Sequence, residues 1–175
     1  MAQKETGSTY ITHPFGPLYS WESRVLILGS FPSVKSREQN FFYGHPQNRF
    51  WKVISILFCE PEPLTIEDKK RLILNNKLAL WDSIAGCEIT GSSDSSIRNA
   101  NANDISIILD NAQVRKIFTN GKKSHELYTK YIEPAIGREA ICLPSTSPAN
   151  AQWTLDRLID AWSVIKETVK NGKDK

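Results

Sequence analysis

The sequence lacks the features that mark several common classes of protein. No apolar run approaches the roughly 20 residues of a membrane-spanning helix, and the first twenty residues show no secretory pattern of charge followed by apolar residues. The three cysteines, Cys59, Cys87 and Cys142, lie far apart without a CxxC pair, so neither a disulfide framework nor a zinc site is indicated. We therefore expect a soluble, cytoplasmic protein with buried thiols, no metal or organic cofactor, and no membrane partner.

Signatures of nucleotide binding are missing as well. Neither GxGxxG nor a P-loop follows any predicted strand, which counts against a nucleotide-binding α/β protein. A formal charge of +3 and an isoelectric point near 8.7 permit an anionic partner without requiring one. A length of 175 residues with 40% hydrophobic content predicts one globular domain over residues 1–175, with its core at about 20–170, and we expect a monomer.

Apolar residues occur in short runs, with helix-length segments between them. Four continuous runs predict buried parallel strands at residues 25–28, 78–81, 116–119 and 140–143. Helices are expected at residues 48–58, 65–76, 104–112, 122–131 and 154–169, the last with one apolar stripe. Polar stretches at residues 91–96 and 99–104 predict a mobile loop. The alternation predicts an α/β fold, a three-layer α/β/α sandwich with a central, mostly parallel four-stranded sheet.

The arrangement of a parallel sheet also predicts where a ligand binds. Ligands of open α/β sheets lie at the carboxyl ends of the strands, because loops and helix N-termini converge there. We therefore expect the site in the loops that begin at Gly29, Asp82, Asn120 and Pro144.

The loop after the first strand is rich in aromatic and polar side chains. Residues 29–33 read GSFPS and residues 41–51 read FFYGHPQNRFW, which sets rings beside Asn, His and Arg. Phe50 and Trp51 are expected to close the end of the core. Asn48 lies near the start of a helix, where an amide either caps the helix or holds a ligand. Both roles stay open at this point.

These residues carry a family resemblance. The loop resembles the first motif of the uracil-DNA glycosylase superfamily, and FYGHPQNRFW is similar to its mismatch-specific branch, which has GINPG where residues 29–33 stand. Residues 143–150, LPSTSPAN, resemble the second motif, typically HPS followed by a small wedge-forming loop. The resemblance spans roughly residues 24–165. Two groups depart from it, because Phe31 takes the place of the customary catalytic Asp or Asn and Leu143 replaces the His.

A GSFPS loop with HPQNRFW retained is similar to the hypoxanthine-DNA, or DNA-deoxyinosine, glycosylase branch. The resemblance implies a monofunctional DNA repair glycosylase that hydrolyses the N-glycosidic bond of hypoxanthine in DNA and leaves an abasic site. Two alternatives remain, a glycosylase for uracil or G:T/U mismatches and a non-catalytic nucleic-acid-binding module of the same fold. The expected partner is DNA that contains a deaminated base.

The resemblance also implies roles for individual residues. Asn48 is expected to be catalytic and to hold the attacking water by accepting its hydrogen bond. Tyr43 is the expected base-stacking ring, with a buried core tyrosine as the alternative, and a structural role is favoured for His45. The predicted substrate-binding residues are Gly29, Ser30, Phe31, Pro32, Ser33, Tyr43, His45 and Asn120. The predicted DNA-binding residues are Lys122, Lys123, Ser145, Thr146, Ser147, Pro148 and Ala149, with solvated lysines and a plain Ser/Pro turn as alternatives.

Overall fold

A parallel sheet of four strands forms the centre of the molecule, which a computed structural model describes over residues 9–171. The strands are β2 (Val25–Gly29), β3 (Leu78–Asp82), β6 (Lys116–Asn120) and β7 (Ala140–Leu143). They lie in the order β3-β2-β6-β7, and every neighbouring pair is parallel. All four coincide with the predicted apolar runs, and three of them continue one residue further, to Gly29, Asp82 and Asn120.

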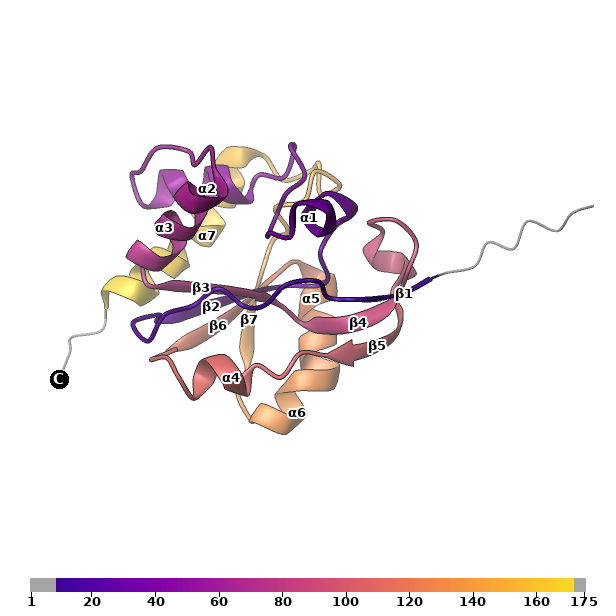
Figure 1. Cartoon of the computed structure of the whole chain (residues 1–175). Helices are drawn as coiled ribbons and strands as arrows, with labels where there is room; N and C mark the ends of the chain where they lie inside the picture. The colour runs from indigo at the N-terminus through magenta and orange to yellow at the C-terminus, as the bar shows by residue number, and fades with distance from the viewer. Residues whose placement is uncertain (1–8, 172–175) are drawn as a thin grey trace, which may run out of the picture.

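Helices cover both faces of this sheet (Figure 1). One face carries α2 (Phe50–Leu57), α3 (Ile66–Asn75) and α7 (Leu155–Lys170). The other carries α4 (Ser106–Leu109), α5 (Lys122–Leu127), the π-helical turn η2 (Tyr128–Ile132) and α6 (Glu133–Ile136). A short helix, α1 (Val34–Gln39), follows β2. The predicted three-layer α/β/α sandwich is therefore confirmed.

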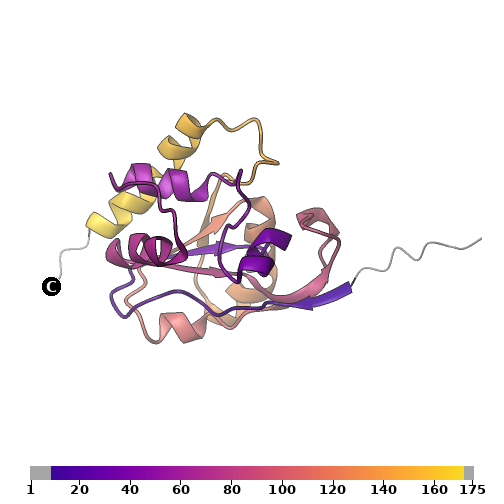
Figure 2. The same cartoon turned by 45° about the horizontal axis from the view of Figure 1, so that its top comes forward.

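A second, antiparallel sheet extends the molecule beyond the carboxyl end of β3 (Figure 2). It contains β1 (Thr9–Thr12), β4 (Ile84–Ile89) and β5 (Arg98–Ala102) in the order β1-β4-β5. The prediction of a mobile loop was wrong for residues 99–102, which belong to β5, and Asp94–Ser96 forms a 3-10 turn, η1. β5 is an edge strand that is exposed along most of its length, so its polar sequence gives no strand signal.

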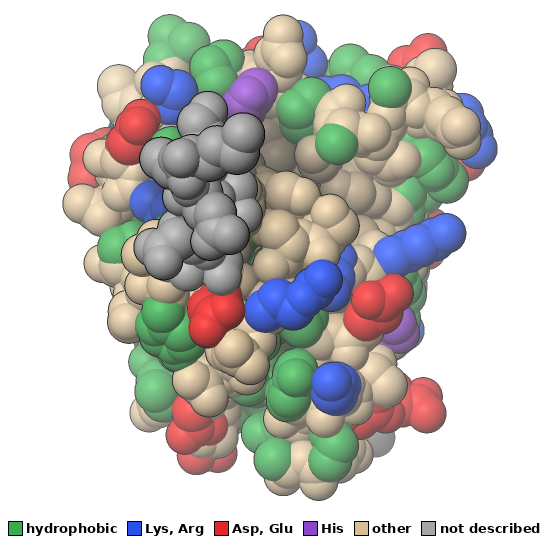
Figure 3. All heavy atoms as spheres, turned by 90° about the vertical axis from the view of Figure 1, so that its right-hand side faces the viewer, with side chains coloured by type: hydrophobic (Ala, Val, Ile, Leu, Met, Phe, Trp, Pro, Cys, Tyr) green, Lys and Arg blue, Asp and Glu red, His purple; other side chains and the backbone are tan. Residues whose placement is uncertain are grey.

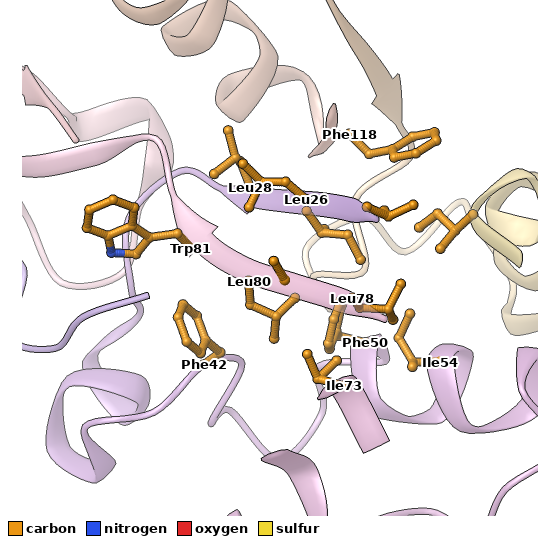
Figure 4. Packing of buried hydrophobic residues seen from close by; sticks show 14 of the residues in the cluster. Leu26, Leu28, Phe42, Phe50, Ile54, Ile73, Leu78, Leu80, Trp81 and Phe118 are labelled. Atoms are coloured by element: carbon orange, nitrogen blue, oxygen red, sulfur yellow. The ribbon is translucent and has the colours of Figure 1, made fainter. Parts of the chain in front are cut away.

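The packing of the sheet against α2, α3 and α7 fixes where the loops begin. Figure 4 shows Leu80 of β3 beside Phe42, with Phe50 and Ile73 in the same layer. The apolar stripe of α7 is confirmed, since Leu158, Trp162 and Ile165 are fully buried. Cores of this kind are packed as densely as organic crystals, so they hold attached loops in place.

The three cysteines differ in exposure. Cys87 is buried, but Cys59 and Cys142 are exposed, so the prediction of three buried thiols is wrong for two of them. Cys142 lies on the edge strand β7, which has no neighbour on one side to cover it. Among residues 9–171, no helix combines the length and apolar character that crossing a bilayer requires.

Candidate functional site

A pocket of about 280 Å³ opens at the carboxyl edge of the parallel sheet, where the topology predicts it. Loops that follow β2, β3, β6 and β7 line it, together with the aromatic loop before α2. The structure brings together fourteen of the sixteen predicted site residues as lining groups: Gly29, Ser30, Phe31, Pro32, Ser33, Tyr43, His45, Asn48, Asn120, Ser145, Thr146, Ser147, Pro148 and Ala149. Lys122 and Lys123 lie outside the lining. The two resembling motifs thus face each other across one cavity.

Three side chains join the two motifs through hydrogen bonds. Thr146, which is fully buried, donates from Oγ1 to Asn48 Oδ1 (2.9 Å) and accepts from Asn120 Nδ2 (3.0 Å). Its backbone N–H donates to Asn120 Oδ1 (3.0 Å). Because its buried hydroxyl is already hydrogen-bonded to Asn48 and Asn120, Thr146 does not fit the predicted role of a phosphate contact. It fixes the positions of Asn48 and Asn120 instead.

The amide of Asn48 has a defined orientation. The backbone N–H of Phe50 donates to Oδ1 (2.9 Å), and a backbone N–H can only meet an acceptor, so this atom is the oxygen. Since Thr146 donates to the same atom, both lone pairs of the oxygen are used. Asn48 therefore caps the first N–H of α2 from the position before the N-cap residue, Arg49, and it also lines the pocket. Its Nδ2 group is the part left to meet a ligand. The expectation that Asn48 accepts a hydrogen bond from the water is therefore wrong, because Oδ1 is occupied; a water held at Nδ2 would accept the hydrogen bond instead.

Tyr43 stands at the inner end of the aromatic loop in a strained conformation. Its φ of 51° lies in the left-handed region, which is rare for an aromatic residue. One face of the ring stacks on Phe50, with centroids 4.0 Å apart and planes at 21°, and Trp51 Nε1 donates to the backbone oxygen of Tyr43 (3.2 Å). The second face is the one that a stacked base would use. Phe50 and Trp51 are buried in the core, as predicted.

The hydroxyl of Tyr43 lies at the closed end of the pocket. It is buried, and among residues 9–171 no group makes a full hydrogen bond to it, although the Asn120 side chain lies close enough to interact. Burial, together with the negative charge of Asp82, raises the pKa of Tyr43, so the hydroxyl keeps its proton. A buried donor without a partner is costly, and a bound ligand with an acceptor atom would relieve that cost.

The wedge loop, residues 147–153, is held by Arg49. Its guanidinium donates to the backbone oxygens of Ser147 (3.0 Å), Asn150 (3.1 Å) and Trp153. Its own N–H donates to Thr146 O (3.1 Å). These contacts place Pro148 and the exposed Ala149 at the rim of the pocket. The sequence interpretation assigned no role to Arg49, although its place beside Asn48 was visible.

The predicted lysine pair begins α5, beside the second motif. Lys122 is exposed and Lys123 is half-buried. The preceding Gly121 has a φ of 94°, and a Cβ there would lie 3.0 Å from Ser145 Cβ, so only glycine lets these loops approach. On the side of the molecule shown in Figure 3, basic and acidic side chains are interspersed, so the small net charge forms no continuous basic patch there. DNA contact by this pair stays a prediction.

Comparison with known proteins agrees with this geometry. The model of the uracil DNA glycosylase superfamily matches residues 17–166. The chain belongs to this superfamily. It is 33% identical over 138 residues to a protein named hypoxanthine DNA glycosylase from Methanosarcina barkeri, covering 78% of this chain and 86% of that one. A protein of the same name from Methanosarcina acetivorans is 32% identical over 149 residues, or 84% and 93% of the two chains.

A solved structure supports the same assignment. The solution NMR structure of a candidate uracil DNA glycosylase from Methanosarcina acetivorans superposes with a TM-score of 0.77 at 29% identity, covering 91% of this chain and 99% of that one. Family, fold and relatives together identify the protein as a DNA glycosylase.

In this glycosylase Asp82, which lines the pocket, forms a buried pair with His13; the sequence interpretation placed Asp82 at the start of a site loop but assigned no role to it and missed His13. Asp82 ends β3, and its carboxylate accepts from His13 Nε2 (2.7 Å). Phe15 N donates to His13 Nδ1 (3.3 Å), so Nδ1 carries no proton and Nε2 is the donor. A Cβ on Gly29 would collide with Asp82 Oδ1, which shows how closely the carboxylate lies under the first motif. A polar residue directly after a buried apolar run was the available signal.

A second carboxylate, Asp94, also lines the pocket of the glycosylase. It lies in the loop between β4 and β5, and Ser30 Oγ donates to its Oδ1 (2.7 Å). Burial and the charge of Asp82 raise the pKa of Asp94, although Ser30 and Lys123 oppose the shift. Among residues 9–171, no three His, Cys, Asp or Glu side chains gather as metal ligands.

The two departures from the family motifs have structural explanations. Phe31 is buried in a small apolar cluster under the second sheet, with Ile84, Cys87 and Leu127. Leu143 is buried in the main core at the end of β7. His45 lines the pocket, and its Nδ1 accepts from Gln47 N (3.1 Å), which is the local structural role that the sequence favoured.

Proposed function

We propose that this glycosylase hydrolyses the N-glycosidic bond of deoxyinosine in DNA, releasing hypoxanthine and leaving an abasic site. The names of the two Methanosarcina relatives support this substrate. The observation that carries the proposal is the polar pattern of the pocket, which complements the edge of hypoxanthine that deamination changes.

In the pocket a hydrogen-bond acceptor, the Asp82 carboxylate, lies near backbone N–H donors of the first motif. Deamination of adenine turns the C6 amine into a carbonyl and places a hydrogen on N1. Asp82 supplies an acceptor for N1–H in the pocket, and the backbone N–H groups of residues 30–33 other than Pro32, which has none, are the proposed donors to the carbonyl. Adenine would set its bare N1 lone pair against the carboxylate, which costs binding free energy because both groups then lose their hydrogen bonds.

The geometry of the rim supports extrusion of the nucleotide. A base inside duplex DNA must be flipped out, at a cost of a few kcal/mol, before a pocket of this size can hold it. We propose that Pro148 and Ala149 enter the gap in the duplex and that the free face of Tyr43 stacks on the extruded base. Arg49 keeps the wedge loop in place, so less chain entropy is lost on binding.

Hydrolysis then needs charge stabilisation and a positioned water rather than a protein nucleophile. Breaking the bond builds positive charge on the sugar and negative charge on the base. Asn48 Nδ2 is the proposed anchor of the water oxygen. No Lys or Cys is among the described residues that line the pocket, which supports a monofunctional enzyme in which water, not an amine, attacks the sugar.

Excision assays on defined oligonucleotides test the proposal. Duplexes that contain hypoxanthine, uracil, xanthine or a G:T mismatch are incubated with excess enzyme, and alkali then cleaves the abasic sites. We expect release of hypoxanthine at least about tenfold faster than of uracil, and none from a matched adenine duplex. Faster release of uracil or thymine would replace the proposed substrate. Binding of these duplexes without abasic product would indicate the non-catalytic module instead.

A further inference from the structure

The loop that carries Asp94 is fixed against the first motif. Ser92 Oγ accepts from Val34 N (2.9 Å), and Arg37 donates to Gly91 O (3.2 Å), so α1 holds the loop on one side. Ser30 holds Asp94 itself, by donating to Oδ1. The second carboxyl oxygen of Asp94, Oδ2, is left for a proton or a ligand.

The surroundings give the two pocket carboxyls different tasks. Asp82 accepts a hydrogen bond from the neutral His13 ring and serves as an acceptor. Asp94 faces Asp82 of β3 and Lys123 of α5, and burial with the charge of Asp82 outweighs Lys123 and Ser30, so the pKa of Asp94 is raised. Two carboxyls of one cavity whose surroundings differ in this way can divide the work, one as an acid and the other as a hydrogen-bond acceptor.

A purine leaving group creates a need for such an acid. When the bond between C1′ and N9 breaks, its electron pair stays on the base, and a proton on N7 neutralises that charge. Uracil has no N7 and leaves as a delocalised anion. Tyr43 cannot supply the proton, because burial raises the pKa of its hydroxyl.

We propose that Asp94 is the general acid that protonates N7 of the departing hypoxanthine; this inference rests on the proposed function. The proton moves from Asp94 Oδ2 to N7 as the C1′–N9 pair passes to the base, so hypoxanthine leaves neutral. The water oxygen bonds to C1′, and its surplus proton returns through solvent to the Asp94 carboxylate.

Two substrates separate this role from a structural one. Deoxyinosine needs a proton on N7, whereas N7-methyldeoxyinosine already carries a positive charge there. Asp94→Asn keeps the size of the side chain and an oxygen for Ser30. We expect it to slow single-turnover release of hypoxanthine about 10²-fold and release of N7-methylhypoxanthine less than about threefold. Asp110→Asn, which removes an exposed carboxylate after α4, serves as the charge-matched control and should change neither rate.

The pH profile gives an independent readout. The acid works only when protonated, so the wild-type rate on deoxyinosine should fall as the pH rises through the pKa of Asp94. In Asp94→Asn that fall should vanish. The ratio of the wild-type rate to the Asp94→Asn rate on deoxyinosine should therefore shrink with rising pH. Equal slowing of both substrates, or an unchanged profile, would overturn the role of Asp94 alone. Failure of the wild-type enzyme to release hypoxanthine would overturn the proposed function and this inference with it.

Discussion

The two roles of Asn48 depend on different atoms, the cap on Oδ1 and the proposed water anchor on Nδ2, so the choice of substitution decides which role is lost. Asn48→Ala removes both. Loss of the cap costs about 1 kcal/mol, and leaving the buried Thr146 hydroxyl without its acceptor adds about 1–3 kcal/mol. At roughly 2–4 °C per kcal/mol for a protein of this size, the combined loss of about 2–4 kcal/mol should lower the midpoint of thermal unfolding by about 4–16 °C. Asn48→Ala is therefore no clean test of catalysis.

Asn48→Asp keeps an oxygen for both Phe50 and Thr146 and changes only the group that faces the pocket. We expect wild-type thermal stability within about 1 kcal/mol, because the cap is retained. Single-turnover release of hypoxanthine should fall about 10²-fold or more, since a donor to the water becomes a negative acceptor. Excision is measured with excess enzyme and alkali cleavage, and unfolding by calorimetry. A stable Asn48→Asp variant that excises hypoxanthine at the wild-type rate or faster would refute the donor role.

Three further changes test the neighbouring contacts. Thr146→Val deletes the hydroxyl between Asn48 and Asn120, so chemical denaturation should show a loss of about 1–3 kcal/mol, with slower excision; unchanged values would mean that the bridge contributes nothing. Arg49→Lys cannot bond three carbonyls at once, so fluorescence anisotropy should show several-fold weaker binding to lesion DNA while activity on a single-stranded substrate changes less. Asp82→Asn should reduce excision of hypoxanthine by about one to two orders of magnitude and weaken discrimination against adenine in competition binding; retained discrimination would exclude Asp82 as the N1–H acceptor.

The parallel sheet could be predicted because its strands are buried on both faces. Residues 25–29 are wholly apolar or glycine and fully covered, so the hydrophobic run alone specifies a strand. β5 has the sequence RNANA and none of its residues is fully buried, so it has no hydrophobic run and the same reasoning predicted a loop. β5 is a strand because it pairs with β4, and that pairing cannot be read from the residues of β5 alone.

Some residues of the site could be predicted from the sequence and others could not. The two motif loops were found because many unusual residues are close together in the sequence, but the pair of His13 and Asp82 spans 69 positions and has no local signature. Asp94 lies in a Ser-rich stretch whose composition is typical of an ordinary surface loop. Burial gives both carboxyls their significance, and burial depends on how the second sheet packs against the first.

That packing also bears on the loss of the customary acid at position 31. Phe31 serves the apolar cluster under the second sheet, where burying a carboxylate costs several kcal/mol and Arg37, whose guanidinium lies over the Phe31 ring, would offset only part of that cost. The same sheet carries the β4–β5 loop that brings Asp94 over the pocket, and the segment after β1 brings His13 to Asp82. Phe31 thus supports the second sheet, and that sheet carries the loop and the segment that bring Asp94 and His13 to the site. Phe31→Asp should therefore destabilise the second sheet and displace the Asp94 loop without restoring a pyrimidine-specific enzyme, and rapid uracil release by a stable Phe31→Asp variant would contradict this coupling.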